Sequence, residues 1–227
     1  MKSLKVSARL GSPLCGDPPH LDALLELALA HAQGMPTYEI DRSRPCPPVA
    51  QIGIPLVRRW INGSLVSCCS SPILSEMECE RVEHVNTRFP LENSPRLSEG
   101  ERTIVATSNA QFKSYRLPLR IRNVSQIAWF ALSGDKRRLL RVLQRNIRSL
   151  GKKRSVGYGR VTAWEVDEVS ADWSWFATDQ DGTQVLMRPL PLGVELPESL
   201  TGCRQDFGGC QPPYWHPDRY QEIVVPC

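Results

Sequence analysis

The sequence predicts an α+β fold of the ferredoxin-like class, in which a split β-α-β unit occurs twice around a long insertion. Two segments have the apolar spacing of helices, one between Pro18 and Gly34 and one over residues 136–150, and each follows a strand-like segment. A further strand-like segment, residues 160–166, follows the second helix. A polar stretch that contains prolines separates the two halves, so we expect an insertion there.

The first half begins with a strand and a helix. Apolar and polar residues alternate over residues 4–10, which is typical of a strand with one buried face. We expect Asp17 to cap the next helix, Pro18 to take its first position and Gly34 to end it. The apolar residues of this helix recur at helical spacing: Leu21, Leu24, Leu25 and Ala28.

A β-hairpin and a less regular region come next. Residues 52–61 and 64–69 are joined by Asn62-Gly63, a dipeptide that favours the φ > 0 conformation of a tight hairpin turn. Residues 82–89 and 103–108 have the composition of extended segments. Residues 112–116, Phe-Lys-Ser-Tyr-Arg, mix aromatic and basic side chains, which suits nucleotide contacts and equally suits an exposed hairpin without a role.

The second half contains a helix with two distinct faces. Residues 127–132 read as a buried strand, residues 136–150 as the helix, and Gly151 as its end. At 100° per residue, one stripe faces a sheet and the other faces away from it. The apolar stripe is Leu139, Leu143, Ile147 and Leu150, and the opposite stripe is Arg137, Arg141, Arg145 and Arg148.

Positive charge is concentrated in one window of the chain. Residues 136–160 contain ten Lys or Arg and no Asp or Glu, whereas the other residues contain 18 basic and 24 acidic ones. A merely solvated helix face usually mixes both signs, because oppositely charged side chains one turn apart attract each other. The window therefore predicts a surface for an anionic partner.

The loop between this helix and the last strand combines glycines with cations. Glycines allow sharp turns and close approach of backbone N–H groups to an anion, and an aromatic ring offers a surface for a stacked base. The loop has neither a Walker phosphate motif nor a dinucleotide fingerprint, so mononucleotide binding is disfavoured. Its candidate RNA-binding residues are Lys152, Lys153, Arg154, Gly157, Tyr158, Gly159 and Arg160.

Cysteine usage and hydropathy set further expectations. None of the eight cysteines forms a C-x-x-C pair, so we expect neither a disulfide framework nor a zinc site. Cys203, Cys210, His216 and Cys227 fit no established ligand spacing. No segment has a signal-peptide pattern or about 20 consecutive apolar residues. We expect a soluble protein of the cytoplasm, with no cofactor, metal or membrane partner.

Four motifs are similar to those of one family. They are Gly16–Asp22 after the opening strand, the loop Gly151–Arg160, Arg188–Pro191, and Pro213–Pro217. A glycine loop before the last strand of a ferredoxin-like (RRM-like) fold is the hallmark of the RAMP superfamily of CRISPR-associated proteins. With the other motifs, the chain resembles the group-five-like small subunit of type IV CRISPR effector complexes over its whole length.

The resemblance implies a subunit that caps the 5′ handle of a guide RNA. Its partners would be the RNA, backbone RAMP subunits and the large subunit, with target DNA met only through the complex. Residues 1–167 would form the RAMP core, including a "thumb" over about 80–122, and residues 168–227 an extension packed on the core or on a neighbouring subunit. The implied thumb contacts to RNA are Arg88, Phe112, Lys113, Tyr115 and Arg116.

The resemblance also raises the question of catalysis. Some RAMP proteins are metal-independent endoribonucleases that use a histidine as general base. Here His20, at the start of the first helix, is the candidate. In type IV systems a separate RAMP protein is implied to cut the repeat RNA, so the favoured expectation is a binding subunit without catalytic residues. The alternatives are a nuclease that processes CRISPR repeat RNA and, secondly, a general RNA-binding protein outside CRISPR.

Overall fold

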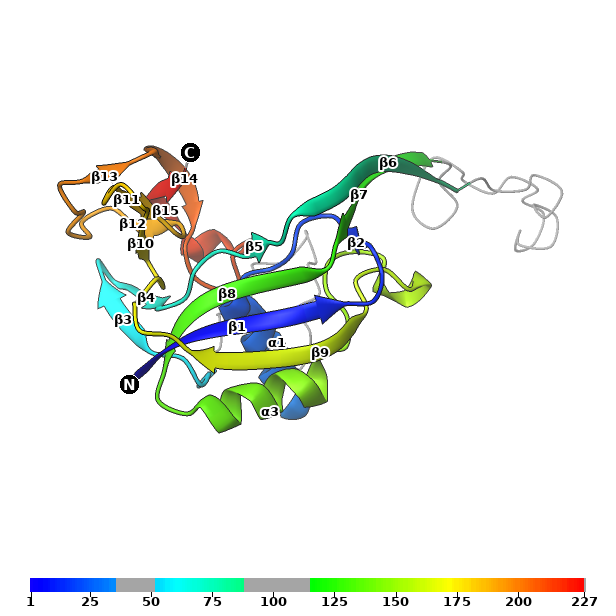
Figure 1. The fold of residues 1–227 in the computed structure, drawn as a ribbon, viewed down its shortest axis with the longest axis horizontal. Coiled ribbons are helices and arrows are strands. Elements are labelled where there is room, and N and C mark those ends of the chain that lie inside the picture. Colours follow the sequence, from blue (N-terminus) through cyan, green and yellow to red (C-terminus); the bar gives the residue numbers. More distant parts are fainter. Residues whose placement is uncertain (36–51, 88–114, 227) are drawn as a thin grey trace, which may run out of the picture.

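A computed structural model describes residues 1–35, 52–87 and 115–226 of the chain, and its fold is α+β (Figure 1). Its centre is a four-stranded antiparallel sheet with the strand order β5-β8-β1-β9. The elements of this unit are β1 (Lys2–Leu10), α1 (Leu21–Ala32), β5 (Ile73–Leu74), β8 (Gln126–Ser133), α3 (Lys136–Asn146) and β9 (Val161–Glu168).

One apolar core joins both helices to one face of this sheet. The inward residues of β1, Leu4, Val6 and Ala8, have no solvent exposure, as the alternating pattern predicts. From the helices, Leu25 of α1 and Leu139 of α3 pack into the same core. The predicted opening strand and its buried face are therefore confirmed.

Helix α1 begins later than the sequence predicts. Residues 17–20 are not helical, and His20, with extended backbone angles, occupies the N-cap position. The adjacent prolines explain the delay, because a residue before proline is disfavoured in the helical conformation. Asp17 is not the cap; its carboxylate instead accepts a hydrogen bond from Arg122 at 2.9 Å.

The predicted hairpin forms, but it is not part of the central sheet. Strands β3 (Arg58–Ile61) and β4 (Ser64–Ser67) pair with each other alone, and Asn62 and Gly63 have φ values of 45° and 77°. These positive angles are those of the turn that Asn-Gly favours. The edge position next to β8 is taken by the short strand β5, which the sequence pattern does not predict.

Helix α3 is shorter than its apolar stripe. It ends at Asn146, and Ile147 is extended, with φ −120° and ψ 98°. Backbone pairing with the last strand explains this end: the carbonyl of Arg148 accepts from Val161 N at 2.9 Å, and Leu150 N donates to Gly159 O at 2.8 Å. Arg148 therefore lies beyond the helix, although the predicted apolar stripe through Leu150 is buried as expected.

A two-stranded arm projects from one end of the molecule (Figure 1). It consists of β6 (Met77–Thr87) and β7 (Tyr115–Val124), and β2 (Leu14–Cys15) pairs with β7 at its base. The extended conformation predicted for residues 82–89 is found as far as Thr87. The segment 103–108 lies outside the described residues.

The C-terminal residues form small sheets at the opposite end of the molecule from the arm (Figure 1). They pack around a second apolar core that includes Val66 of the hairpin together with Leu190 and Ile223. No helix of the described residues has the length and apolar character that crossing a membrane requires. The strands are β10 (Phe176–Thr178), β11 (Gln184–Leu186), β12 (Leu190–Pro191), β13 (Leu200–Thr201), β14 (Cys203–Gly209) and β15 (Tyr220–Pro226), and the 3₁₀ turn η4 (Pro217–Arg219) precedes β15. A second 3₁₀ turn, η3 (Arg154–Val156), lies in the loop between α3 and β9.

Candidate nucleic-acid interface

Helix α3 presents arginines to solvent on the face opposite its buried leucines. Leu139 and Leu143 have no exposure, while the arginines on the far side are exposed. Asp135 caps the helix, because its carboxylate accepts a hydrogen bond from Arg138 N at 2.8 Å. The amphipathic phase predicted from the sequence thus places the side chains of Arg137, Arg141 and Arg145 outward.

The loop after this helix is held on the segment that follows β1. Lys152 N donates to Cys15 O at 2.8 Å, and Gly159 N donates to Pro13 O at 2.8 Å. Ser12 makes two further bonds, donating from Oγ to Gly157 O at 2.7 Å and accepting from Arg160 N at 2.9 Å. These bonds fix the loop backbone on this segment, and the aliphatic part of the Lys152 side chain lies beside Gly16.

Two glycines of the loop have different roles. A Cβ on Gly159 would lie 2.0 Å from Leu150 O, and its φ is +64°, so this glycine is required by the turn. A Cβ on Gly157 would meet nothing within 4 Å, although φ is +98° there. Gly159 therefore serves packing, while Gly157 lies at an open position where a ligand can approach the backbone.

The cations of the helix and loop form what we call the basic surface. All of its members are exposed except Lys153, which is half-buried. Within the part of the chain that the structure describes, none of them forms an ion pair with a carboxylate. Its members are Arg137, Arg141, Arg145, Arg148, Lys152, Lys153, Arg154 and Arg160.

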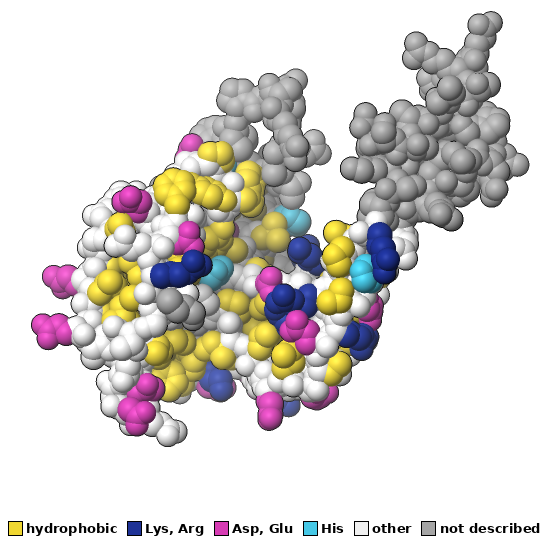
Figure 2. All heavy atoms as spheres, turned by 90° about the horizontal axis from the view of Figure 1, so that it is seen from above, with side chains coloured by type: hydrophobic (Ala, Val, Ile, Leu, Met, Phe, Trp, Pro, Cys, Tyr) yellow, Lys and Arg dark blue, Asp and Glu magenta, His cyan; other side chains and the backbone are white. Residues whose placement is uncertain are grey.

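Three arginines of the arm are paired with carboxylates. Arg120 and Arg122 both pair with Glu80, at 3.1 and 3.2 Å, and Arg81 pairs with Glu83 at 2.7 Å. Figure 2 shows basic and acidic side chains side by side along this part of the molecule. The arm therefore offers much less net positive charge to an anion than the basic surface does.

The predicted thumb contacts lie mostly beyond what the structure describes. Arg88, Phe112 and Lys113 are outside the described residues, and Tyr115 is described only as the first residue of β7. Arg116, on β7, is exposed. Their contacts to RNA stay predictions.

Tyr158 links the loop to the base of the arm. Its hydroxyl donates to Glu83 Oε2 at 2.5 Å, and its partly buried ring packs against a small cluster with Leu119 and Ile121. The hydrogen bond from Tyr158 lowers the pKa of the Glu83 carboxyl and raises that of the phenol. The ring thus has a packing partner in the free protein, and base stacking by Tyr158 stays a prediction.

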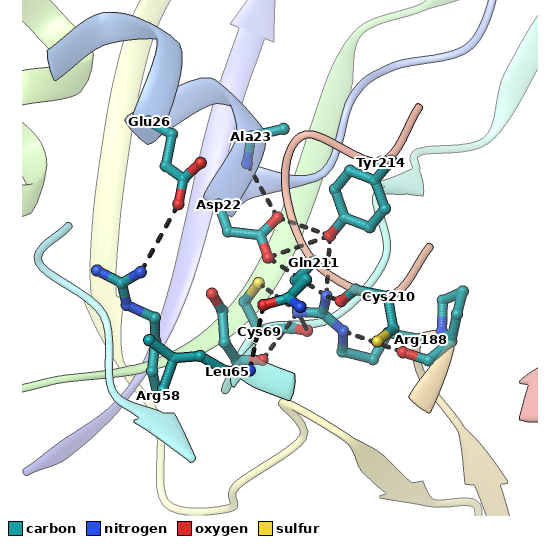
Figure 3. A network of polar contacts seen from close by, with 12 residues as sticks. Asp22, Ala23, Glu26, Arg58, Leu65, Cys69, Arg188, Cys210, Gln211 and Tyr214 are labelled. Carbon is teal, nitrogen blue, oxygen red and sulfur yellow. Dashed lines mark hydrogen bonds and ion pairs between the residues drawn. The ribbon is translucent and has the colours of Figure 1, made fainter. Parts of the chain in front are cut away.

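Three of the four sequence motifs meet in one buried polar network (Figure 3). Asp22 and Arg188 have no solvent exposure and form an ion pair at 3.3 Å, and the Tyr214 hydroxyl donates to Asp22 Oδ1 at 2.9 Å. The guanidinium also donates to four carbonyl groups, those of Ser67, Cys69, Pro189 and Cys210, at 2.8, 3.0, 3.4 and 2.7 Å. The network therefore ties α1 and the hairpin to the C-terminal segment.

Sequence reasoning did not find this network. The available signal was Asp22 itself, a carboxylate between Leu21 and Leu24 on the buried side of α1. A buried charge requires a partner, and arginine is the partner best suited to several hydrogen bonds at once. The sequence offers many arginines, however, and nothing in their spacing selects Arg188.

His20, the candidate catalytic residue, lies against this network. Its ring stacks on Tyr214 with centroids 4.7 Å apart, and its Nδ1 is buried with no hydrogen-bond partner. Burial, aided by the charge of Arg188, lowers the pKa of His20 to about 4. A general base that works near neutral pH needs a pKa close to that pH and access to the substrate. The lowered pKa and the enclosed Nδ1 of His20 meet these two requirements less well than a surface histidine would.

The cysteines do not assemble a metal site in the described part of the chain. Cys15, Cys68, Cys69 and Cys210 are buried as free thiols, and burial raises the pKa of each of them. No group of three His, Cys, Asp or Glu side chains is gathered as ligands among the described residues. His216 Nδ1 instead accepts from Asp218 N at 3.2 Å.

Comparison with known proteins identifies the family. Residues 75–226, about two thirds of the chain, match the family described as CRISPR type IV associated protein Csf3. The chain belongs to this family, which confirms the resemblance inferred from the motifs. A comparison with curated proteins finds no match. The family membership supports a role as a subunit of a type IV CRISPR complex, and the matched region contains the arm, the basic surface and Arg188.

Proposed function

We propose that the chain is the RNA-binding subunit that caps the 5′ handle of the guide RNA in a type IV CRISPR effector complex. It contacts backbone RAMP subunits and the large subunit, and it meets target DNA only through the complex. The observation that carries the proposal is the basic surface, because its cations have no ion-pair partner among the described residues. Unpaired cations on a rigid support suit a phosphate backbone.

The strand order supports a RAMP-type core. Taking β1, β5, β8 and β9 as the four strands in chain order, the sheet has the order 2-3-1-4, with every neighbouring pair antiparallel. This is the arrangement of two interlocked split β-α-β units. We assign residues 1–167 to a ferredoxin-like core, about 80–122 to a thumb, and 168–227 to an extension.

The test is a triple replacement in the loop. Lys152, Lys153 and Arg154 are changed to Ala, and affinity for the guide RNA is measured by fluorescence anisotropy from low to high salt. Each phosphate contact of a single strand contributes about 0.7 to the slope of log K against log salt. We expect weaker binding and a slope reduced by about 2 for three contacts.

A matched control removes the same charge elsewhere. Lys2, Arg9 and Arg204 are exposed and already paired, with Glu168, Glu165 and Asp206. Changing these three residues to Ala should leave the salt slope near that of the unchanged protein. Equal slopes in the loop variant and the unchanged protein would refute RNA binding by the loop.

The proposed role is binding without catalysis. His20 is packed on Tyr214 and its Nδ1 is enclosed, so its position favours a structural role. Purified protein incubated with labelled repeat RNA in EDTA should leave the RNA intact. Specific cleavage that disappears in His20→Ala would establish the nuclease alternative instead.

Capping of a defined handle is tested by the bound RNA itself. The protein is purified from its native host and the short RNAs that accompany it are sequenced. A shared 5′ end is expected for a capping subunit. A random population of RNA ends would indicate a general RNA-binding protein outside CRISPR.

A further inference from the structure

Two aromatic rings lie exposed beside each other on the sheet formed by β12, β15 and β14. Phe207 of β14 is 65% exposed and Tyr220 of β15 is 46% exposed, with ring centroids 6.1 Å apart. Adjacent exposed aromatic side chains are typical of surfaces that a partner covers. Phe207 lies opposite Glu222 in the strand register, and Tyr220 is two residues before Glu222 on β15. Both rings and the Glu222 carboxylate therefore project from one face of the sheet.

The opposite face of β15 belongs to the interior. Gln221 donates from Nε2 to Ser64 Oγ at 2.7 Å, and Ile223 is buried in the second apolar core. Since side chains alternate along a strand, Tyr220 and Glu222 project away from these interior contacts. We call Phe207, Tyr220 and Glu222 the aromatic surface.

The free edge of β14 does not favour the addition of another strand. Within residues 1–35, 52–87 and 115–226, no strand pairs with this edge. Glu222 O accepts from Leu192 N on the β12 side, so the backbone N–H of Phe207, opposite Glu222, faces the free edge. The Asp206 carboxylate accepts from Phe207 N at 2.8 Å and so takes the place of an added strand's carbonyl. A partner should therefore contact the side chains of the face.

The charge of this part of the molecule is negative. Residues 168–226 contain nine Asp or Glu and three Lys or Arg, and one of these three is the buried Arg188. On the face that Figure 2 draws, acidic side chains are prominent at the end opposite the arm. Glu222 itself is exposed and forms no ion pair with any residue that the structure describes. Such a surface repels a phosphate backbone and attracts a cation.

We propose that the aromatic surface docks a positively charged segment of another protein, with an arginine side chain stacked on the rings and paired with Glu222. A guanidinium group stacks on aromatic faces and pairs with carboxylates, and it is less strongly hydrated than an ammonium group. The inference rests on the proposed function in one respect: the partner is a protein subunit of the same complex. It assigns that contact to residues that the basic surface does not share.

A blocked tetra-arginine peptide tests the surface in the full chain. The peptide is titrated at constant ionic strength while the backbone ¹H–¹⁵N signals are followed, with blocked tetra-lysine and tetra-glutamate in parallel. We expect saturable shifts at Phe207, Tyr220 and Glu222 with tetra-arginine, weaker binding of tetra-lysine, and no shift with tetra-glutamate. The signals of α3, whose exposed face is itself basic, should not move.

Matched variants separate this surface from the general charge of the C-terminal residues. Phe207→Ala and Glu222→Gln should each weaken tetra-arginine binding about threefold, the size expected of a cation–π contact or an ion pair at an exposed site. Trp60→Ala removes a side chain that is 66% exposed on β3, and Asp181→Asn removes an exposed carboxylate between β10 and β11. Both control variants should bind the peptide as the unchanged protein does.

The partner itself is tested in the complex. A tagged chain is co-expressed with the other protein subunits of its type IV complex, without guide RNA, and the subunits that accompany it are quantified. Glu222→Arg places like charge against a cationic partner, so their recovery should fall about tenfold or more, with unchanged affinity for guide RNA. The triple variant of Lys152, Lys153 and Arg154 should behave in the opposite way. The two assays therefore distinguish failure of this inference from failure of the proposed RNA binding.

Several results would overturn the inference. A shift of the Phe207 signal by guide RNA and not by tetra-arginine would make the surface a base-stacking site. The same shift on concentrating the chain alone would mean that a second copy covers the rings. Unchanged peptide affinity in both Phe207→Ala and Glu222→Gln, or no recovery of protein subunits by the unchanged chain, would rule out docking at this surface.

Discussion

Arginine occupies two opposite settings in this molecule. Arg188 has no solvent exposure, and its guanidinium is satisfied by Asp22, Tyr214 and backbone carbonyls from two other segments, residues 67–69 and 210. The arginines of the basic surface are exposed and form no ion pair with any described residue. The same side chain therefore holds distant segments together in one region and presents free charge in the other.

The two settings differ in how much stability the protein loses when the guanidinium group is removed. Removing a buried partner leaves an uncompensated charge in a medium of low dielectric, which is strongly destabilising. Removing an exposed cation loses only interactions that water already replaces. Replacing Arg188 should therefore lower the free energy of unfolding, whereas replacing residues of the basic surface should weaken RNA binding.

The largest expected effect is that of Arg188→Met. This change leaves the Asp22 carboxylate buried, with only the Tyr214 hydroxyl and the backbone N–H of Ala23 as hydrogen-bond donors. We expect a loss of about 3–5 kcal/mol in the free energy of unfolding, measured by urea denaturation. Arg141→Met, on the exposed face of α3, should change stability by less than about 0.5 kcal/mol.

A double replacement sharpens this prediction. Asp22→Asn removes the buried charge while it keeps the shape of the side chain. In that background Arg188→Met should cost less than it does alone, because no unpaired carboxylate remains. Equal costs in the two backgrounds would show that Arg188 acts by packing and not by pairing with Asp22.

A smaller effect is expected at the glycines that support the basic surface. Gly159→Ala places a Cβ against Leu150 O and should cost about 3 kcal/mol of unfolding free energy. Gly157→Ala, at an open position with positive φ, should cost about 1 kcal/mol. Similar costs at both positions, measured by urea denaturation, would contradict the distinction between a glycine required by the turn and one at an open position.

The sequence predicts a feature of these regions when residues adjacent in the chain determine it, and fails when contacts between distant residues determine it. The exposed face of α3 and the turn at Asn62-Gly63 follow from residues adjacent in the chain, and both were predicted. The end of α3 at Asn146 was not, because pairing with β9 overrides helical spacing there. Asp22 and Arg188 are 166 residues apart, and no local pattern relates them.

The smallest net effect is expected in the dependence of stability on pH, because two groups beside the buried network oppose each other. The pKa of His20 is lowered to about 4, so its contribution to stability is present above pH 6.5 and lost as pH falls toward 4. The pKa of Glu26 is raised to about 7, so its contribution is present below pH 4.5 and lost as pH rises toward 7.

Between pH 4.5 and 6.5 the two slopes therefore have opposite signs, and the unfolding free energy of the unchanged protein should be nearly level. Replacing either residue leaves only the pH dependence that the other residue causes. In His20→Asn, stability should fall as pH rises through this window, and in Glu26→Gln it should rise. Urea denaturation at half-unit steps of pH measures both slopes. Parallel curves for the two variants would mean that burial shifts the pKa of neither residue, and a lowered pKa would then no longer argue against a catalytic role for His20.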